Sequence, residues 1–296
     1  MIERWLPMLA VSSQPFDSPE HVFEVKWDGV RALAAVEASG WRIWGRERSD
    51  YTQRYPELES LRSLPAGTVL DGELIVLESG RAAFATLMRR HQLLSGRKIQ
   101  AASRFCPATY VVFDLLYAGG QSLLGRPLSE RRQRLQELVA RQPPCRVAFS
   151  DGLVGAGRDF FQKVVEQGHE GVMAKHLGSR YLPGQRGQAW RKIKPFRTLP
   201  CVVIGYTASR HGIRSLLVAA DHQGKLQYVA ELTGLSDEAQ GQLAPGLFRH
   251  PRSKPVVPCP KPGQWVEPEL YCQVCYLVRT HHGRLRGARY RGLIQA

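Results

Sequence analysis

The 296 residues predict an α+β fold in two domains, an N-terminal domain with antiparallel sheets and a C-terminal OB-fold β-barrel. Short runs of alternating apolar residues, each ended by Gly or Asp, dominate residues 20–78 and predict strands. Helical spacing follows at residues 83–94, 128–141 and 158–167. Beyond residue 200 come several short strands with little helix, which is the pattern of a small barrel.

The first domain is expected to open with strands and tight turns. EHVFEVKWDG, RALAAVEASG and WRIWGRERSD form the first series, and residues 67–80 read as a hairpin-like pair with Gly80 at its end. Residues 108–118 form an apolar run that predicts a buried strand. Ser129 is a candidate N-cap of the second helix, and Gly168 is a candidate C-cap of the third. The segment GVMAKHL then returns to strand.

A boundary is predicted in the stretch KIKPFRTLP, which Pro195 and Pro200 bracket. We therefore expect domains at 1–197 and 198–296, joined by a flexible hinge. The second domain is expected to consist of the strands CVVIGYT, SLLVAAD, LQYVAELTGL and QWVEPELYCQVCYLVRT, with a helical or loop segment at 236–262.

Arginine dominates the charge of the chain. The 41 cations comprise 32 Arg and 9 Lys against 26 acids, which leaves a net charge of +15. This excess favours nucleic acid or an anionic membrane surface as a partner, although genome base composition also produces a high Arg:Lys ratio. No run of 18 apolar residues and no secretory signal is found, so we expect a cytoplasmic protein without a transmembrane helix.

The cysteines are too dispersed for a small disulfide scaffold and suit a reducing compartment. They are Cys106, Cys145, Cys201, Cys259, Cys272 and Cys275. The last two form a CxxC pair that leaves a zinc site open. Their segment reads as a strand, however, on which residues three apart point to opposite faces, and no second CxxC pair accompanies them.

The sequence EVKWDGVRA, residues 24–32, carries the strongest chemical signal. Lys26 lies at a strand that turns sharply at Asp28-Gly29, where glycine permits a backbone geometry that other residues resist. Arg31 brings a second cation back toward Lys26. A lysine held near other cations loses its proton more readily, and the neutral amine is a nucleophile that attacks phosphorus. By itself, the motif also fits an exposed strand lysine beside an ordinary turn.

KWDGVR resembles the adenylation motif of the covalent nucleotidyltransferases, which comprise DNA ligases, RNA ligases and mRNA capping enzymes. Five further blocks similar to that family's motifs follow in the same order, and the resemblance covers essentially the whole chain. They are WGRERSDYTQRYPEL (44–58), LDGELIVL (70–77), YVVFDLLY (110–117), EGVMAK (170–175) and RYLPGQRGQAWRKIKP (180–195). The chain is most similar to bacterial ATP-dependent DNA ligases, both stand-alone enzymes and the ligase domain of ligase D.

The resemblance implies a role for each motif residue, with ATP as AMP donor and Mg²⁺ or Mn²⁺ as metal. Lys26 becomes the nucleophile, Glu24 faces the adenine amino group, and Phe113 stacks on the base. Glu73 binds the ribose or a metal, and Glu170 binds the metal. The positive charge near the phosphates comes from Arg31, Arg46, Arg186, Lys192 and Lys194.

The implied fold is the ATP-grasp-like adenylation domain of ligases followed by an OB-fold domain. The implied activity is the sealing of 5′-phosphate/3′-hydroxyl nicks in duplex DNA through a lysyl-AMP intermediate. The implied partners are nicked duplex DNA and a Ku-type end-binding protein, with no membrane. We expect a monomer in the cytoplasm, associated with the nucleoid.

The C-terminus departs from the family pattern GLRxDK, because GLIQA stands at 292–296 with Ile294 in the Arg position and Ala296 in the Asp position. We expect self-adenylation to suffer more than the sealing of pre-adenylated nicks. Two alternatives follow. One is an RNA ligase of the same superfamily, which the match through the C-terminal domain opposes. The other is a DNA-end-binding protein with impaired self-adenylation, which the intact Lys26 motif opposes.

Overall fold

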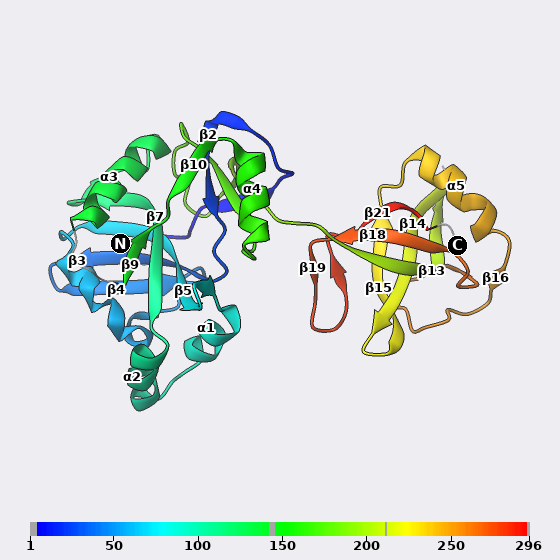
Figure 1. Ribbon diagram of the computed structural model, residues 1–296, viewed down its shortest axis with the longest axis horizontal. Coiled ribbons are helices and arrows are strands. Elements are labelled where there is room, and N and C mark those ends of the chain that lie inside the picture. The colour runs from blue at the N-terminus through cyan, green and yellow to red at the C-terminus, as the bar shows by residue number, and fades with distance from the viewer. Residues whose placement is uncertain (1–4, 142–145, 211, 295–296) are drawn as a thin grey trace. The chain divides into compact units, whose positions relative to one another are not determined.

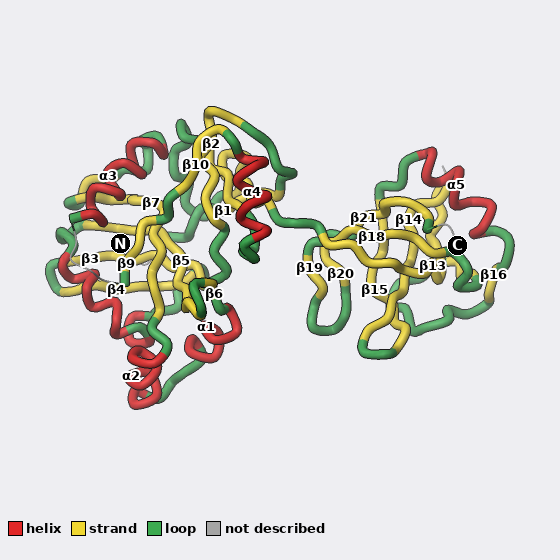
Figure 2. The backbone as a smooth tube through the Cα atoms, viewed as in Figure 1, coloured by secondary structure: helices red, strands yellow, loops and turns green. Residues whose placement is uncertain are grey.

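Figure 1 shows the computed structural model, which describes residues 5–141, 146–210 and 212–294. The chain divides into two compact units, Met1–Lys194 (unit 1) and Pro195–Ala296 (unit 2). Cys145 and Ala296, both discussed above from the sequence, lie outside the described residues. Most strand pairs in both units are antiparallel, as expected of the α+β class, and Figure 2 shows the strands and helices of each unit.

One sheet of unit 1 has the strand order β1–β12–β11–β2–β10. β1 and β12 pair in parallel, which the sequence did not indicate, and the other neighbours are antiparallel. The strands are β1 (Leu9–Ser12), β2 (Ser18–Val25), β10 (Gly152–Gly155), β11 (Val172–His176) and β12 (Arg186–Ile193). β2 lies between two neighbours, so its residues 21–24 are all buried.

The second sheet of unit 1 has the order β4–β3–β5–β7–β8, with β6 beside β5 and β9 parallel to β7. Its strands are β3 (Val30–Glu37), β4 (Gly40–Gly45), β5 (Thr68–Glu78), β6 (Arg81–Ala82), β7 (Ala108–Ala118), β8 (Gln121–Ser122) and β9 (Val147–Phe149). The hairpin expected within 67–80 is instead one long strand, with only β6 folding back at its end. Gly72 lies within this strand, and glycine is needed there because a Cβ would lie 2.6 Å from the Tyr110 ring.

Helices lie at the margins of these sheets (Figure 2). They are α1 (Phe84–His91), α2 (Gly96–Phe105), α3 (Leu128–Ala140) and α4 (Gly157–Glu166), with 3-10 helices η2 (Thr52–Arg54) and η3 (Pro56–Ser63). The sequence missed α2 and the two 3-10 helices. Ser129 lies inside α3, and Pro127 occupies the N-cap position instead. Gly168 follows α4 with φ +82°, which suits its predicted C-capping role.

The two sheets of unit 1 pack against each other through a shared apolar cluster. The cluster includes Leu33 of β3, Phe113 of β7 and Trp190 of β12. The chain passes from the first sheet to the second between β2 and β3, through residues 26–29. Lys26 therefore stands at the crossing between two packed sheets.

Unit 2 is built around a seven-stranded antiparallel sheet. Its strands and helix are β13 (Arg197–Ser209), β14 (Gly212–His222), β15 (Lys225–Thr233), α5 (Asp237–Leu247), β16 (Pro251–Arg252), β17 (Gln264–Val266), β18 (Tyr271–Tyr276) and β21 (Arg289–Leu293). A separate hairpin joins β19 (Val278–Arg279) and β20 (Leu285–Arg286). The first strand starts at Arg197, four residues before the expected start, and continues through Pro200.

The CxxC pair of unit 2 lies on β18, as the strand interpretation expects. Cys272 pairs across the sheet with Cys201, and both side chains are buried in the apolar core. Burial raises the pKa of each of these two thiols to about 12, which keeps them protonated. Among the described residues, no helix combines the length and apolar character that crossing a membrane needs.

Candidate active site

A cavity of about 380 Å³ opens in unit 1 where the chain crosses between the two sheets. All ten residues singled out from the sequence line it. They are Glu24, Lys26, Arg31, Arg46, Glu73, Phe113, Glu170, Arg186, Lys192 and Lys194. They come from strands and loops of both sheets, so only the tertiary fold brings them together.

Lys26 follows the last residue of β2, and its backbone is fixed by a bond from its N–H to the Gly171 carbonyl (2.8 Å). Its Nζ pairs with Glu170 Oε2, and the other carboxylate oxygen of Glu170 pairs with Lys194. The sequence suggested that Arg31 brings a second cation close to Lys26. Both residues line the cavity, but the ion pair of Lys26 is with Glu170, whereas the Arg31 guanidinium pairs with Asp71.

Gly29 is required here for a reason other than the one inferred from the sequence. It is not among the glycines with positive φ, so no unusual backbone angle demands glycine. Instead, a Cβ at this position would lie 2.2 Å from the carbonyl oxygen of Leu74 on β5. The turn between β2 and β3 is thus pressed against β5, and only a hydrogen side chain fits.

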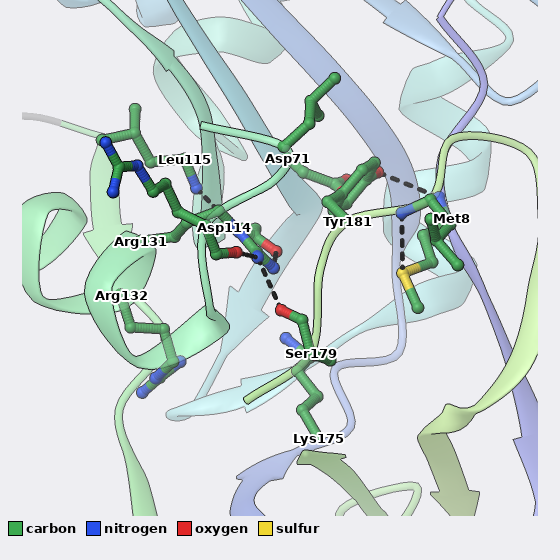
Figure 3. A network of polar contacts seen from close by, with 12 residues as sticks. Met8, Asp71, Asp114, Leu115, Arg131, Arg132, Lys175, Ser179 and Tyr181 are labelled. Atoms are coloured by element: carbon green, nitrogen blue, oxygen red, sulfur yellow. Dashed lines mark hydrogen bonds and ion pairs between the residues drawn. The ribbon is translucent and has the colours of Figure 1, made fainter. Parts of the chain in front are cut away.

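Arg31 reaches the cavity wall while its guanidinium is held by Asp71 of β5. Nε and Nη2 bond the two carboxylate oxygens at 2.6 and 2.5 Å. Burial opposes the charge, but Asp71 outweighs it and holds the pKa of Arg31 above its ordinary value. Tyr181 donates to the same carboxylate at 2.6 Å and accepts from the Met8 N–H, a network that Figure 3 shows.

Glu24 is buried at the inner end of the cavity, and both its carboxylate oxygens are bonded. Oε1 accepts from Arg132 of α3, and Oε2 accepts from Lys175 Nζ (2.8 Å) and Ser150 Oγ (3.3 Å). Arg132 also donates to the Ser150 carbonyl at 3.1 Å. The expected contact between Glu24 and adenine stays a prediction. The structure adds that this carboxylate is oriented by two cations.

Phe113 lies on β7 beneath two cations. Lys175 Nζ is 3.9 Å and the Arg31 guanidinium carbon 4.5 Å from its ring centroid. Trp190 packs edge-on at 6.0 Å. The ring is only 7% exposed, so a base could reach it only through the cavity. Burial lowers the pKa of Lys175, with a further contribution from Arg132.

The remaining cations form a rim. Arg46 and Arg186 are exposed on the loop after β4 and at the start of β12, while Lys192 and Lys194 lie further along β12 and just beyond it. Burial lowers the pKa of Lys192, and its cationic neighbours Arg186, Lys194, Lys26 and Arg46 lower it further. Lys192 is thus a lysine whose proton is held less firmly because of burial and the cations around it.

Three acids complete the cavity wall. Burial raises the pKa of Glu73 to about 7 and also raises that of Asp28, with Glu170 adding to both. Burial likewise opposes ionisation of Glu170, but Lys26 and Lys194 outweigh it and hold its pKa below the ordinary value. No three His, Cys, Asp or Glu side chains of the described chain segments cluster as a metal site by themselves.

Sequence reasoning missed Arg132, Ser150, Asp71, Tyr181 and Trp190. Arg132 and Ser150 hold Glu24, whereas Asp71 and Tyr181 hold Arg31. Asp71 lies inside the motif LDGELIVL, so the sequence did point to this segment as part of the site. Arg132 lies in a polar helix full of arginines, where nothing in the sequence separates a buried residue from an exposed one.

Two family models match the chain, one for each unit. An "ATP dependent DNA ligase domain" matches residues 7–194, and an "ATP dependent DNA ligase C terminal region" matches residues 209–295. The end-joining DNA repair protein LigD of Mycobacterium tuberculosis H37Rv is 34% identical over 97% of this chain and 38% of its own length. The chain thus spans well under half of the LigD relatives it matches.

Other relatives are matched over nearly their whole length. The SPbeta prophage-derived DNA ligase-like protein LigB of Bacillus subtilis is 30% identical over 95% of both chains. The solved structure described as mycobacterial DNA ligase D complexed with ATP and MES is 31% identical. It covers 99% of this chain and 96% of its own, with a TM-score of 0.59.

Proposed function

The chain belongs to the family of ATP-dependent DNA ligases, and we propose that it seals 5′-phosphate/3′-hydroxyl nicks in duplex DNA through a lysyl-AMP intermediate. One observation carries the proposal: Lys26 shares a single cavity with a carboxylate partner, an aromatic wall and a cationic rim. An RNA ligase is not favoured, since both matching family models describe DNA ligases.

In the first step, Lys26 Nζ attacks the α-phosphorus of ATP. A P–N bond forms, the bond to the pyrophosphate oxygen breaks, and the amine gives up a proton. Before attack, the Lys26 ammonium must leave its ion pair with Glu170 and release one proton to water, which is separate from the proton lost as the P–N bond forms. Glu170 retains Lys194 as a partner when Lys26 moves, so its charge stays compensated. The rim cations Arg46, Arg186 and Lys192 offset the charge on the phosphate oxygens and the leaving group.

The adenosine is proposed to enter the inner part of the cavity. Phe113 offers a flat apolar face, and Glu24 offers a carboxylate acceptor for the amino group of adenine. Lys175 lies between them, bonded to Glu24 and above the Phe113 ring, so an entering base must displace or accommodate its ammonium. Glu73 is proposed to contact the ribose or a metal.

The acids of the cavity suit Mg²⁺ or Mn²⁺. Magnesium in such sites uses one or two carboxylates together with substrate phosphates and water, so the lack of a three-acid cluster among the described residues does not oppose it. Glu170 would hold the ion, with Glu73 or Asp28 beside it. Burial is the main cause of the raised pKa values of Glu73 and Asp28, and the negative charge of Glu170, which a cation would offset, adds to both. When bound, the ion neutralises charge on the phosphate oxygens.

In the second step, AMP passes from Lys26 to the 5′-phosphate of the nick. In the third, the 3′-hydroxyl attacks that phosphate and AMP leaves. We propose that residues 1–197 form the adenylation domain and 198–296 an OB-fold domain joined by a hinge. The antiparallel β13–β14–β15 and β13–β18–β21 pairings support the barrel assignment. Both domains are basic and suit a clamp on the DNA backbone.

Partners and location follow from the same assignment. We propose nicked duplex DNA as the substrate and a Ku-type end-binding protein as a partner, because the LigD relatives are named for non-homologous end joining. The protein is proposed to act as a monomer on the nucleoid, in the cytoplasm.

The test is formation of a covalent adenylate from labelled ATP and Mg²⁺. Wild type should retain label through denaturing electrophoresis, and Lys26→Ala should retain none. Lys163→Ala, an exposed lysine of α4, is the matched control and should label as wild type does. A Lys26→Ala protein that still carries acid-labile AMP, or a wild type that carries none, contradicts the proposal.

A further inference from the structure

One segment of unit 1 combines positive charge with exposed apolar side chains. Between Glu78 and Asp114 the sequence holds six cations and no acid. Leu94 and Phe105 in this segment are 84% and 88% exposed, more than any other large apolar side chain among the described residues. A run of cations alone is usually a solvated face. The two apolar side chains call for a different explanation.

The cations of this segment have different surroundings. Arg90 is buried and pairs with Glu57 of η3, so it is structural. Arg89, Arg97, Lys98 and Arg104 are exposed, and none of them forms an ion pair within the described residues. Together with Leu94 and Phe105, these four form what we call the α1–α2 surface.

The backbone around Phe105 is anchored, although its side chain is exposed to solvent. It is the last residue of α2, and Arg90 of α1 donates to the carbonyls of Ala102 (3.1 Å) and Cys106 (2.7 Å) on either side of it. Ile99 anchors the same helix in the interior. The backbone that carries the ring is therefore anchored, which reduces the backbone entropy lost when a base packs on the ring.

The helix α1, which carries Arg89 of the α1–α2 surface, starts at the candidate active site. Phe84, the first residue of α1, lines the cavity, and Arg81 just before it lies beside Gly168, two residues from Glu170. Figure 1 shows α1 and α2 below β5 and β7 in this view of unit 1. Leu94 precedes α2 and Phe105 ends it, a separation of about 15 Å along the helix.

We propose that the α1–α2 surface binds an unpaired DNA strand next to the join, such as an overhang or a gap strand. The four cations contact phosphates, and Phe105 stacks on a base. Unpaired bases expose flat faces that stack on aromatic rings, whereas a duplex presents mainly its phosphates to such a surface. The proposal rests on the proposed function in its choice of DNA, and it names a substrate feature that nick sealing does not require.

The test is binding of a fluorescein-labelled oligothymidylate to the full chain, followed by anisotropy at several KCl concentrations. Phe105→Ala should weaken binding about tenfold without changing the salt dependence, because stacking involves no counterion release. Phe105→Trp should restore it. Arg97→Ala/Lys98→Ala should reduce the slope of log K against log salt by about 1.4, at roughly 0.7 per charge on single strands.

Phe248→Ala and Lys225→Ala, at exposed positions of unit 2, are the matched controls and should bind within about twofold of wild type. Binding by Phe105→Ala within twofold of wild type overturns the proposal and leaves a charge-only duplex contact or a protein partner as the occupant. Binding lost in Phe105→Ala and not regained by Phe105→Trp also overturns it.

Sealing assays separate this proposal from the proposed function. Phe105→Ala should seal fully paired nicks at the wild-type rate and join ends with overhangs several-fold more slowly. An equal loss on both substrates contradicts a role for unpaired strands. Failure of the wild type to form a lysyl adenylate would overturn the proposed function, yet the oligothymidylate binding result would stand by itself.

Discussion

Glu24 and Arg132 lie 108 residues apart in the chain and meet in the interior of unit 1. A carboxylate and two cations, Arg132 and Lys175, are taken out of water there, and their mutual bonds offset the cost of desolvation. The arrangement fixes the side chain two residues before Lys26. A single residue of α3 therefore supports the candidate active site without lining its cavity.

Removing that support should destabilise the fold. Arg132→Leu leaves the buried Glu24 carboxylate with one cation fewer, and we expect the free energy of unfolding to fall by about 3 kcal/mol, measured by urea denaturation. Arg134→Leu, two residues further along α3, breaks an exposed pair with Glu130 and should change the free energy of unfolding by under about 0.5 kcal/mol. Equal losses of unfolding free energy in the two variants would show that the buried pair stabilises the fold no more than the exposed pair does.

Glu73 should make stability depend on pH. Burial raises its pKa from the ordinary 4.5 to about 7, so between these values the folded chain binds more protons than the unfolded chain. The contribution of Glu73 to the stability of the fold is fully present below a pH of 4.5, and it is lost as the pH rises through about 7. In Glu73→Gln, the melting temperature should fall less than in wild type between about pH 5 and about pH 8. Parallel melting curves for the two proteins would refute the assignment.

At the scale of elements, the connection from β2 to β3 defines the site. β2 belongs to the first sheet of unit 1 and β3 to the second sheet of unit 1, so Lys26–Gly29 is the point where the chain changes layers. Gly29 makes this possible by letting the turn approach the backbone of β5. The local sequence predicted a sharp turn correctly, but its cause is a contact with a strand about 45 residues later.

Gly29→Ala should therefore be costly. The added Cβ would overlap the Leu74 carbonyl, and we expect a loss of about 3 kcal/mol in unfolding free energy together with loss of the covalent adenylate. Gly125→Ala is the control, because its Cβ would meet no atom within 4 Å and its φ is not positive. A Gly29→Ala protein as stable and as readily labelled as Gly125→Ala would contradict this explanation.

At the scale of the whole molecule, positive charge is spread along the chain. Residues 1–198 carry 29 cations and 20 acids, and residues 199–296 carry 12 cations and 6 acids. A small part of this charge surrounds the cavity, where Glu170 and Asp71 already pair with Lys26, Lys194 and Arg31. The larger part is left for surface contacts, which suits a backbone-binding protein.

Binding and adenylation should respond differently to salt. Affinity for nicked duplex, measured by anisotropy, should fall about a thousandfold between about 50 and 200 mM KCl if six phosphates are contacted. Covalent labelling by ATP should change little over the same range, because the paired groups of the cavity are partly buried and screened less. A duplex affinity that is independent of salt would refute the division of charge proposed here.

The sequence alone determined the α+β class and most of the strands, because apolar periodicity is a local signal. The ten residues that share the cavity came from the resemblance of short motifs to those of the nucleotidyltransferases. The tertiary structure alone decided which atoms those residues face. Lys26 pairs with Glu170, Arg31 with Asp71, and Glu24 with Arg132, each a contact between segments distant in sequence. No periodicity encodes such pairings, since packing of the two sheets fixes them.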